Sequence, residues 1–211
     1  GTKSLICLPD SAPISKVEAT KGYGADVCLV EGCYDDAYQK ALELRDRDGY
    51  TFVHPFDDEN VIAGQGTVGL EIMNDLDDID AIIVPVGGGG LISGIAYAVK
   101  QIRPSIKIYG VQSAGAASMF SSVRNGKIEC LDKVQTVADG IAVKQPGENT
   151  FNLVREYVDD IALVSDDEIS SAILALIEKQ KMIAEGAGAA AVAAAMFGKF
   201  PIEGKKTVCI V

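Results

Sequence analysis

Hydrophobic and polar positions follow two kinds of pattern along this chain. Short apolar runs rich in β-branched residues predict strands at residues 5–8, 27–30, 51–53, 81–86, 106–111, 161–164 and 207–211. Longer stretches with helical spacing of apolar residues predict helices, for example at residues 34–47, 61–76, 91–102 and 165–183. Strands that alternate with helices indicate a three-layer α/β fold, in which mostly parallel, twisted sheets carry helices on both faces.

Two helices have clear local signals. Ser165 and Glu168 form a capping-box pattern, which makes the acidic residues there a helix cap rather than a metal site. The helix after this cap is expected to bury one apolar stripe, formed by Ile169, Ile173, Leu176 and Ile177. Residues 187–195 are almost all alanine and glycine, so they predict a small-residue helix packed tightly inside the protein.

The most informative stretch is the run of four glycines, Gly87 to Gly90, between a strand pattern and a helix pattern. Glycines permit unusual backbone angles and allow a ligand to approach the main chain closely. The first amides of the following helix lack partners within the helix and lie at the positive end of its dipole. This arrangement predicts a phosphate site, and the alternative is a glycine turn that only lets the helix pack closely on the sheet.

The residues around the glycines narrow the choice of phosphate ligand. A nucleotide P-loop requires Gly-Lys-Ser/Thr, whereas Gly90 is followed by Leu91 and Ile92. A dinucleotide fingerprint would place Ser93 where its third glycine belongs, and the next strand ends at Gln112 instead of an acidic residue. NAD is therefore a weak second choice.

Composition excludes several classes of protein. The 211 residues are 48% hydrophobic and carry a net charge of −11, which argues against a nucleic-acid surface. No apolar run is long enough to cross a membrane. Five cysteines without C-x-x-C spacing are expected to be buried free thiols in the cytoplasm: Cys7, Cys28, Cys33, Cys130 and Cys209.

Several motifs, taken together, resemble one family. They are residues 54–58 (HPFDD), 61–67 (VIAGQGT), 84–91 (VPVGGGGL), 137–144 (VADGIAVK) and 184–189 (AEGAGA). In this order they resemble the threonine dehydratases (threonine/serine deaminases) of the pyridoxal-phosphate tryptophan-synthase-β fold, fold type II, with serine racemase as a near relative. The resemblance covers the whole chain and implies two lobes with the cofactor cleft between them. Residues 1–54 would form part of the small lobe, and residues 55–211 most of the large cofactor-binding lobe.

The resemblance also implies which residues bind pyridoxal 5'-phosphate. The phosphate would lie on the amides of Gly87, Gly88, Gly89, Gly90 and Leu91. Gly140 would line the ring side of the pocket, or it is an ordinary turn glycine. Glu185 would face the cofactor, or it is an acid at a helix N-terminus. His54, the single histidine, is interpreted as a hinge residue, because one histidine excludes histidine triads and multi-histidine metal sites.

Two parts of the family pattern are missing from residues 1–211. The Schiff-base lysine of a Ser-x-Lys-x-Arg-Gly motif is expected upstream of Gly1, so no catalytic residue is assigned within the chain, and Lys144 is interpreted as structural. The family's ring-nitrogen partner would follow Val211. Gln112 and Ser118 stand where serine racemase has acidic ligands of a divalent cation, so no metal site is expected.

These features favour deamination of threonine and, less efficiently, serine, giving 2-oxobutanoate or pyruvate and ammonia. The alternatives are a serine racemase or another β-eliminating enzyme of the same fold, and a non-catalytic phosphate-binding or regulatory module. The expected partners are a small amino-acid substrate and further copies of the chain in a homodimer or homotetramer, without nucleic acid or membrane. The sequence leaves open whether the role is biosynthetic or catabolic.

Overall fold

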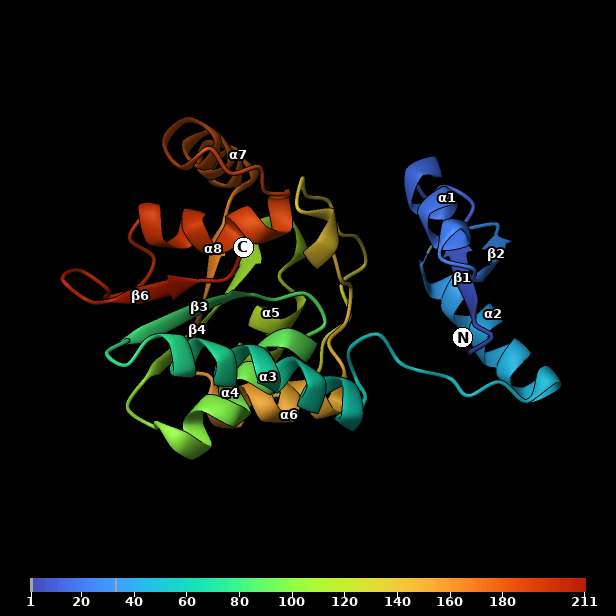
Figure 1. The fold of residues 1–211 in the computed structure, drawn as a ribbon, viewed down its shortest axis with the longest axis horizontal. Helices are drawn as coiled ribbons and strands as arrows, with labels where there is room; N and C mark the ends of the chain where they lie inside the picture. The colour runs from blue at the N-terminus through green and yellow to red at the C-terminus, as the bar shows by residue number, and fades with distance from the viewer. Residues whose placement is uncertain (1, 33) are drawn as a thin grey trace. The chain divides into compact units, whose positions relative to one another are not determined.

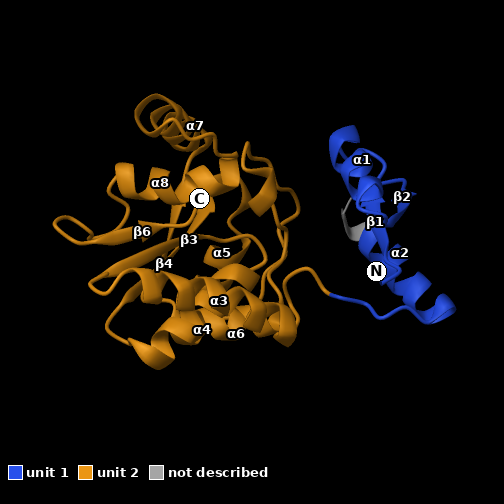
Figure 2. Ribbon diagram, in the orientation of Figure 1, with its two compact units in different colours: residues 1–53 blue, residues 54–211 orange. Residues whose placement is uncertain are grey.

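The chain folds into two compact units, Gly1–Val53 and His54–Val211 (Figure 2). The computed structural model describes residues 2–32 and 34–211. Cys33 therefore lies outside the described residues. The assignment of the two units to parts of a small and a large lobe stays a prediction.

The described residues of the first unit form two parallel strands and two helices. Its elements are β1 (Leu5–Pro9), α1 (Ile14–Gly22), β2 (Asp26–Val30) and α2 (Tyr34–Asp48). The strands pair in parallel, with Leu5 opposite Asp26. Val17 of α1 and Leu44 of α2 are buried, and both helices contact the small sheet. A parallel pair needs a crossover connection, and α1 supplies it.

The second unit is built on a four-stranded parallel sheet with the order β5-β4-β3-β6. The strands are β3 (Ala81–Pro85), β4 (Lys107–Ser113), β5 (Asp160–Val164) and β6 (Thr207–Cys209). All five residues of β3 are buried, as expected for a central parallel strand covered on both faces.

Helices cover both faces of this sheet (Figure 1). One layer contains α3 (Glu59–Asp75), α4 (Gly90–Ile102), α5 (Ser118–Asn125) and α6 (Glu148–Tyr157), and the other contains α7 (Asp166–Ala175) and α8 (Gly186–Met196). Alternate residues of β3 face the two layers. Ile82 and Val84 belong to the core beneath α4, whereas Ile83 belongs to the core beneath α8. The predicted three-layer α/β class is confirmed.

The strand order changes direction at β3. The chain leaves β3 through α4 and returns as β4 on one side, whereas β6 joins the other side of β3 after α8. In open α/β sheets, ligands bind outside the carboxyl ends of the strands at such a switch point. The fold thus places the glycine run, which directly follows β3, at the position where a ligand is expected.

Three local predictions are confirmed. Ser165 accepts a hydrogen bond from the Glu168 amide while the Glu168 side chain accepts from the Ser165 amide, which completes the capping box. The small-residue helix is α8, whose Ala189 and Ala193 are fully buried. The glycine run lies between strand β3 and helix α4.

Other local predictions are wrong. Residues 51–53 form no strand although they are apolar. The helix expected over residues 165–183 is α-helical only to Ala175 and continues as a π-helix, Leu176–Gln180. The wider π turn changes the helical register, and the side chain of Ile177 is 41% exposed instead of completing the apolar stripe.

The cysteines are less buried than expected. Cys7, Cys28 and Cys209 are free and half-buried on strands, while Cys130 is free and exposed. Burial raises the pKa of the Cys209 thiol to about 11, so this thiol stays protonated at neutral pH. Among the described residues, no helix is long and apolar enough to cross a membrane.

Candidate functional site

The candidate site is the glycine loop, defined as residues 86–90, together with the first turn of α4. Gly89 is the N-cap of α4 and has φ = +97°, a left-handed angle that favours glycine. No side chain caps this helix end. The 13-residue helix therefore begins with open amides at the positive end of its dipole.

The amides of the loop are the notable feature. Val86 N donates to Val111 O, and Ser93 N donates to Gly89 O. Between these two bonds, the six amides of residues 87–92 donate to no acceptor within unit 2, all of whose residues the structure describes. Gly88, Gly89 and Gly90 are buried. Buried amides without partners are costly, so this run of donors favours an anionic ligand.

The positions that side chains would occupy at three of the glycines are filled by protein. A Cβ on Gly88 would lie 2.5 Å from the Phe56 ring, and a Cβ on Gly90 would lie 2.9 Å from Phe56 Cβ. A Cβ on Gly89 would lie 2.6 Å from Met119 Cε. These glycines are thus required by packing against the protein. The access to a ligand that the sequence indicates stays a prediction.

Residues 54–58 organise the loop. His54 Nδ1 accepts hydrogen bonds from the amides of Phe56 and Asp57, at 3.2 and 2.8 Å. Asp58 caps α3 by accepting from the amides of Asn60 and Val61. Asp57 accepts from the amides of Glu148 and Thr150 at the start of α6, at 3.0 and 3.1 Å. Residues 54–58, whose His54 is interpreted from sequence as a hinge residue, therefore cap two helices and pack the phenyl ring of Phe56 on the glycine loop.

The environment of His54 gives a pH prediction. Burial lowers the pKa of His54 below its ordinary value of 6.5, against the opposing effect of the Asp57 and Asp58 carboxylates. The folded protein therefore favours the neutral ring, whose unprotonated Nδ1 can accept the two amides. We expect the NMR titration of this single histidine to give a pKa below 6.5. The stability that neutral His54 contributes to the folded protein should be complete above about pH 6.5, and it should decline as the pH falls through the folded-state pKa. A measured pKa above 6.5 would contradict this assignment.

The structure brings the remaining predicted site residues together beside the loop. A Cβ on Gly87 would lie 3.2 Å from Ile141 Cα, in the residue after Gly140. A Cβ on Gly140 would lie 3.1 Å from Glu185 Oε1 and 3.0 Å from Ala187 Cβ. Gly140 and Glu185 are both exposed, and Glu185 is the N-cap of α8. The N-termini of α4 and α8 thus lie at the same edge of the sheet.

Four residues around the loop were missed by the sequence analysis. Phe56 packs on the glycines, Asp57 caps α6, and Thr150 donates to Gly88 O at 2.7 Å. Gln112 donates to Val86 O at 3.1 Å and accepts from Phe120 N at 2.8 Å. None of these contacts has a local sequence signal. The α6 amides that Asp57 caps lie 91 and 93 positions away along the chain. The partners of Thr150 and Gln112 lie 62 and 26 positions away.

The positions considered for a cation are occupied by internal hydrogen bonds. Ser118 Oγ donates to Val143 O at 2.8 Å, and the Gln112 amide joins Val86 to Phe120. Across the part of the chain that the structure describes, no three His, Cys, Asp or Glu side chains gather as a metal site would require. The expected absence of a metal stays a prediction.

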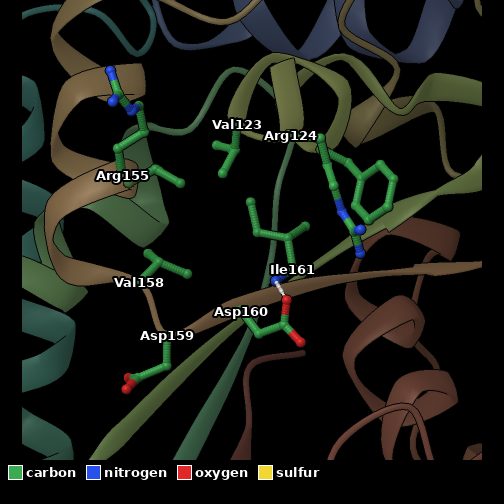
Figure 3. Close-up of a pocket in the computed structure, with 9 residues that line it drawn as sticks. Val123, Arg124, Arg155, Val158, Asp159, Asp160 and Ile161 are labelled. Atoms are coloured by element: carbon green, nitrogen blue, oxygen red, sulfur yellow. Dashed lines mark hydrogen bonds between the residues drawn. The ribbon is translucent and has the colours of Figure 1, made fainter. Parts of the chain in front are cut away.

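A cavity of about 220 Å³ lies elsewhere, between α5, α6 and the start of β5 (Figure 3). Its lining includes Val123, Val158 and Ile161, with Asp159 and Asp160 at one side. Asp159 is already paired with Lys100 and Lys107, at 2.7 Å each. Because β5 is parallel to β3, its start lies at the edge of the sheet opposite to the glycine loop. This cavity is therefore separate from the candidate site.

Comparisons with known proteins agree with this geometry. Residues 1–211 match the family model described as "Pyridoxal-phosphate dependent enzyme". The L-threonine ammonia-lyase of Thermotoga maritima is 48% identical over 211 residues, which cover 100% of this chain and 52% of that protein. The catabolic L-threonine dehydratase TdcB of Escherichia coli is 48% identical over 213 residues, covering 100% and 65%. The chain thus spans less than two thirds of the length of these relatives.

Solved structures show the same similarity. The processed form of threonine deaminase isoform 2 from Solanum lycopersicum has a TM-score of 0.90 and 42% identity, covering 99% of this chain and 58% of that one. Maize serine racemase has a TM-score of 0.93 and 35% identity, covering 99% and 64%. Residues 1–211 all match the family model, and the amides of the glycine loop at the switch point of the sheet have no acceptor within the fully described unit 2. This chain therefore belongs to the pyridoxal-phosphate-dependent enzymes.

Proposed function

We propose that the whole protein is a pyridoxal-phosphate-dependent ammonia-lyase, which converts L-threonine to 2-oxobutanoate and ammonia and converts L-serine less efficiently to pyruvate. The similarity to an L-threonine ammonia-lyase and to a catabolic L-threonine dehydratase supports the reaction and the substrate. The observation that carries the proposal is the run of six amides at residues 87–92, which donate to no acceptor within the fully described unit 2.

The residues of the loop fit the phosphate of this cofactor. Amides at a helix N-terminus bind phosphate without requiring a cationic side chain, and the proposal assigns this role to Gly87, Gly88, Gly89, Gly90 and Leu91. Pyridoxal phosphate supplies a ring that can delocalise negative charge from the α-carbon of an amino acid. The protein has to fix the orientation of that ring, which a rigid phosphate anchor does.

Gly140 and Glu185 are proposed to complete the cofactor side of the site. A side chain on Gly140 would be crowded by Glu185 Oε1 at 3.1 Å and Ala187 Cβ at 3.0 Å. Glycine at this position therefore keeps a flat surface beside the loop. Glu185 lies exposed at the N-terminus of α8 and is proposed to face the cofactor. A lysine that carries the cofactor is expected outside residues 1–211.

The reaction is tested by supplying the full-length protein with pyridoxal 5'-phosphate and L-threonine. The expected result is the formation of equal amounts of 2-oxobutanoate and ammonia, with slower formation of pyruvate from L-serine. If neither oxo acid appears while the cofactor is bound, the proposed activity is wrong.

A second candidate activity, racemisation of serine, is favoured by the TM-score of 0.93 to maize serine racemase. Chiral analysis of the serine that remains after incubation with L-serine separates the two activities. The ammonia-lyase proposal expects pyruvate without accumulation of D-serine.

Two further properties are proposed only for the whole protein. These are a homodimer or homotetramer and a cytoplasmic location. Mass measurement in solution tests the first.

A further inference from the structure

We infer that Thr150 and Gln112 are positioning residues for the phosphate site, because each fixes one peptide group of the glycine loop with its amide turned toward the anion. This inference rests on the proposed phosphate site. It concerns two buried side chains that do not themselves touch the ligand.

The argument begins with the geometry of the peptide group. In a trans peptide, the C=O and the N–H point in opposite directions. A side chain that holds a carbonyl on one side of the loop thus determines where the amide of the next residue points. Such control matters in a glycine run, since glycine passes readily between backbone conformations that other residues avoid.

Thr150 holds the peptide between Gly88 and Gly89. Its Oγ1 lies 2.7 Å from Gly88 O and 3.2 Å from Gly147 O, and because a hydroxyl has a single proton, the shorter contact takes the hydrogen bond. The Gly89 amide must then point to the opposite side, where it has no acceptor within unit 2, which is described throughout. If this peptide turned over, the Gly88 carbonyl would face the anion and repel it.

Gln112 holds the peptide between Val86 and Gly87 in the same way. Its Nε2 donates to Val86 O at 3.1 Å, which directs the Gly87 amide away from Gln112. Its Oε1 accepts from Phe120 N at 2.8 Å, so both ends of the side-chain amide are fixed. Gln112 is fully buried, which excludes water from competing for these bonds.

The position of Thr150 is itself rigid. Thr150 is fully buried in the first turn of α6, and its amide donates to Asp57 Oδ1 at 3.1 Å. Its carbonyl accepts from Ser93 Oγ of α4 at 3.3 Å. Thr150 is therefore fixed to both Asp57 and α4, the helix that follows the glycine loop. Such a fixed residue is suited to holding the loop in one conformation.

The test compares binding of pyridoxal 5'-phosphate with binding of pyridoxal, which has no phosphate. Both dissociation constants are measured by equilibrium dialysis with the cofactor-free full-length protein, so the readout is independent of turnover. The dissociation constant of pyridoxal divided by that of pyridoxal 5'-phosphate gives a ratio that isolates the contribution of the phosphate. Thr150→Val removes the hydroxyl at nearly constant volume, and Thr150→Ser retains it.

We expect Thr150→Val to weaken binding of the phosphorylated ligand by about tenfold, the size of one net hydrogen bond, with pyridoxal affinity unchanged. Thr150→Ser should restore the ratio to the wild-type value. Gln112→Met should lower the ratio in the same direction and provides a second measurement if Thr150→Val does not fold. An unchanged ratio in the folded variants would overturn the inference, whether both affinities stay at the wild-type value or both fall by the same factor.

Ser122 provides a matched control. It is a fully buried residue whose hydroxyl donates to a backbone carbonyl, that of Ser118 at 2.7 Å, and it makes no bond to the glycine loop. Ser122→Ala should lower the melting temperature while leaving the ratio unchanged. If the wild-type protein itself shows no preference for the phosphorylated ligand, the phosphate site has failed, and with it the inference. A wild-type preference that is undiminished in Thr150→Val rejects the inference alone.

Discussion

The Gly89→Ala variant should bind pyridoxal 5'-phosphate more weakly than the wild-type protein by about a hundredfold or more. Gly89 has φ = +97°, and an added Cβ would lie 2.6 Å from Met119 Cε and 2.9 Å from Thr150 Cβ. The free protein can relieve both problems by moving the loop, so binding has to restore the original arrangement. Equilibrium dialysis of the cofactor-free full-length protein measures the loss.

Gly126→Ala is the matched control for this variant. Gly126 also has a left-handed φ, +70°, but an added Cβ would meet no atom within 4 Å. It ends α5 and is separate from the glycine loop. Gly126→Ala should therefore lose stability through backbone strain without a change in cofactor affinity. Wild-type affinity in Gly89→Ala would show that the loop does not hold the phosphate.

The Gly94→Ala variant should show a large loss of stability. Gly94 lies where α4 crosses α3, and an added Cβ would overlap the Ile62 carbonyl oxygen and lie 2.6 Å from Gly66 N. Backbone atoms cannot move aside as a side chain can, so the two helices would have to separate. We expect a loss of about 3 kcal/mol in the free energy of unfolding, at the upper end for overpacking. Thermal unfolding should show a melting temperature lower by roughly 6–12 °C.

Gly64→Ala tests whether this loss comes from the helix crossing. Gly64 is exposed on α3, and an added Cβ would meet no atom within 4 Å. Alanine is the better helix former by about 1 kcal/mol, so this variant should be as stable as the wild type or slightly more stable. A Gly94→Ala protein that melts like the wild type would contradict the close approach of α3 and α4.

The parts of the fold that were predictable from sequence are those fixed by local physics. The capping box at Ser165 and Glu168 depends on residues three positions apart, and the strand-turn-helix around the glycines depends on neighbouring residues. The predicted apolar stripe is wrong at Ile177, which lies in the π-helix after α7, because hydrophobic spacing does not reveal a π turn. Apolar residues 51–53 form no strand, which shows that apolar character alone does not secure a partner in a sheet.

The candidate site divides in a similar way. The glycines and the helix N-terminus were found from sequence, because their roles follow from missing side chains and from helix geometry. Phe56, Thr150 and Gln112 support the loop through contacts between residues distant in the chain, which no local pattern reveals. Gly140 and Glu185 came from the family resemblance, and the structure places them beside each other. Their contact with the cofactor stays a prediction.

The central claim is that backbone amides of residues 87–92 bind the phosphate of pyridoxal 5'-phosphate. A crystal structure of the cofactor-bound full-length protein tests it most directly, through the distances between these nitrogens and the phosphate oxygens. We predict that several of these distances lie within the range of about 2.7–3.2 Å expected for N–H···O hydrogen bonds. A phosphate held elsewhere by lysine or arginine side chains, with these amides bonded only to water, would contradict the claim.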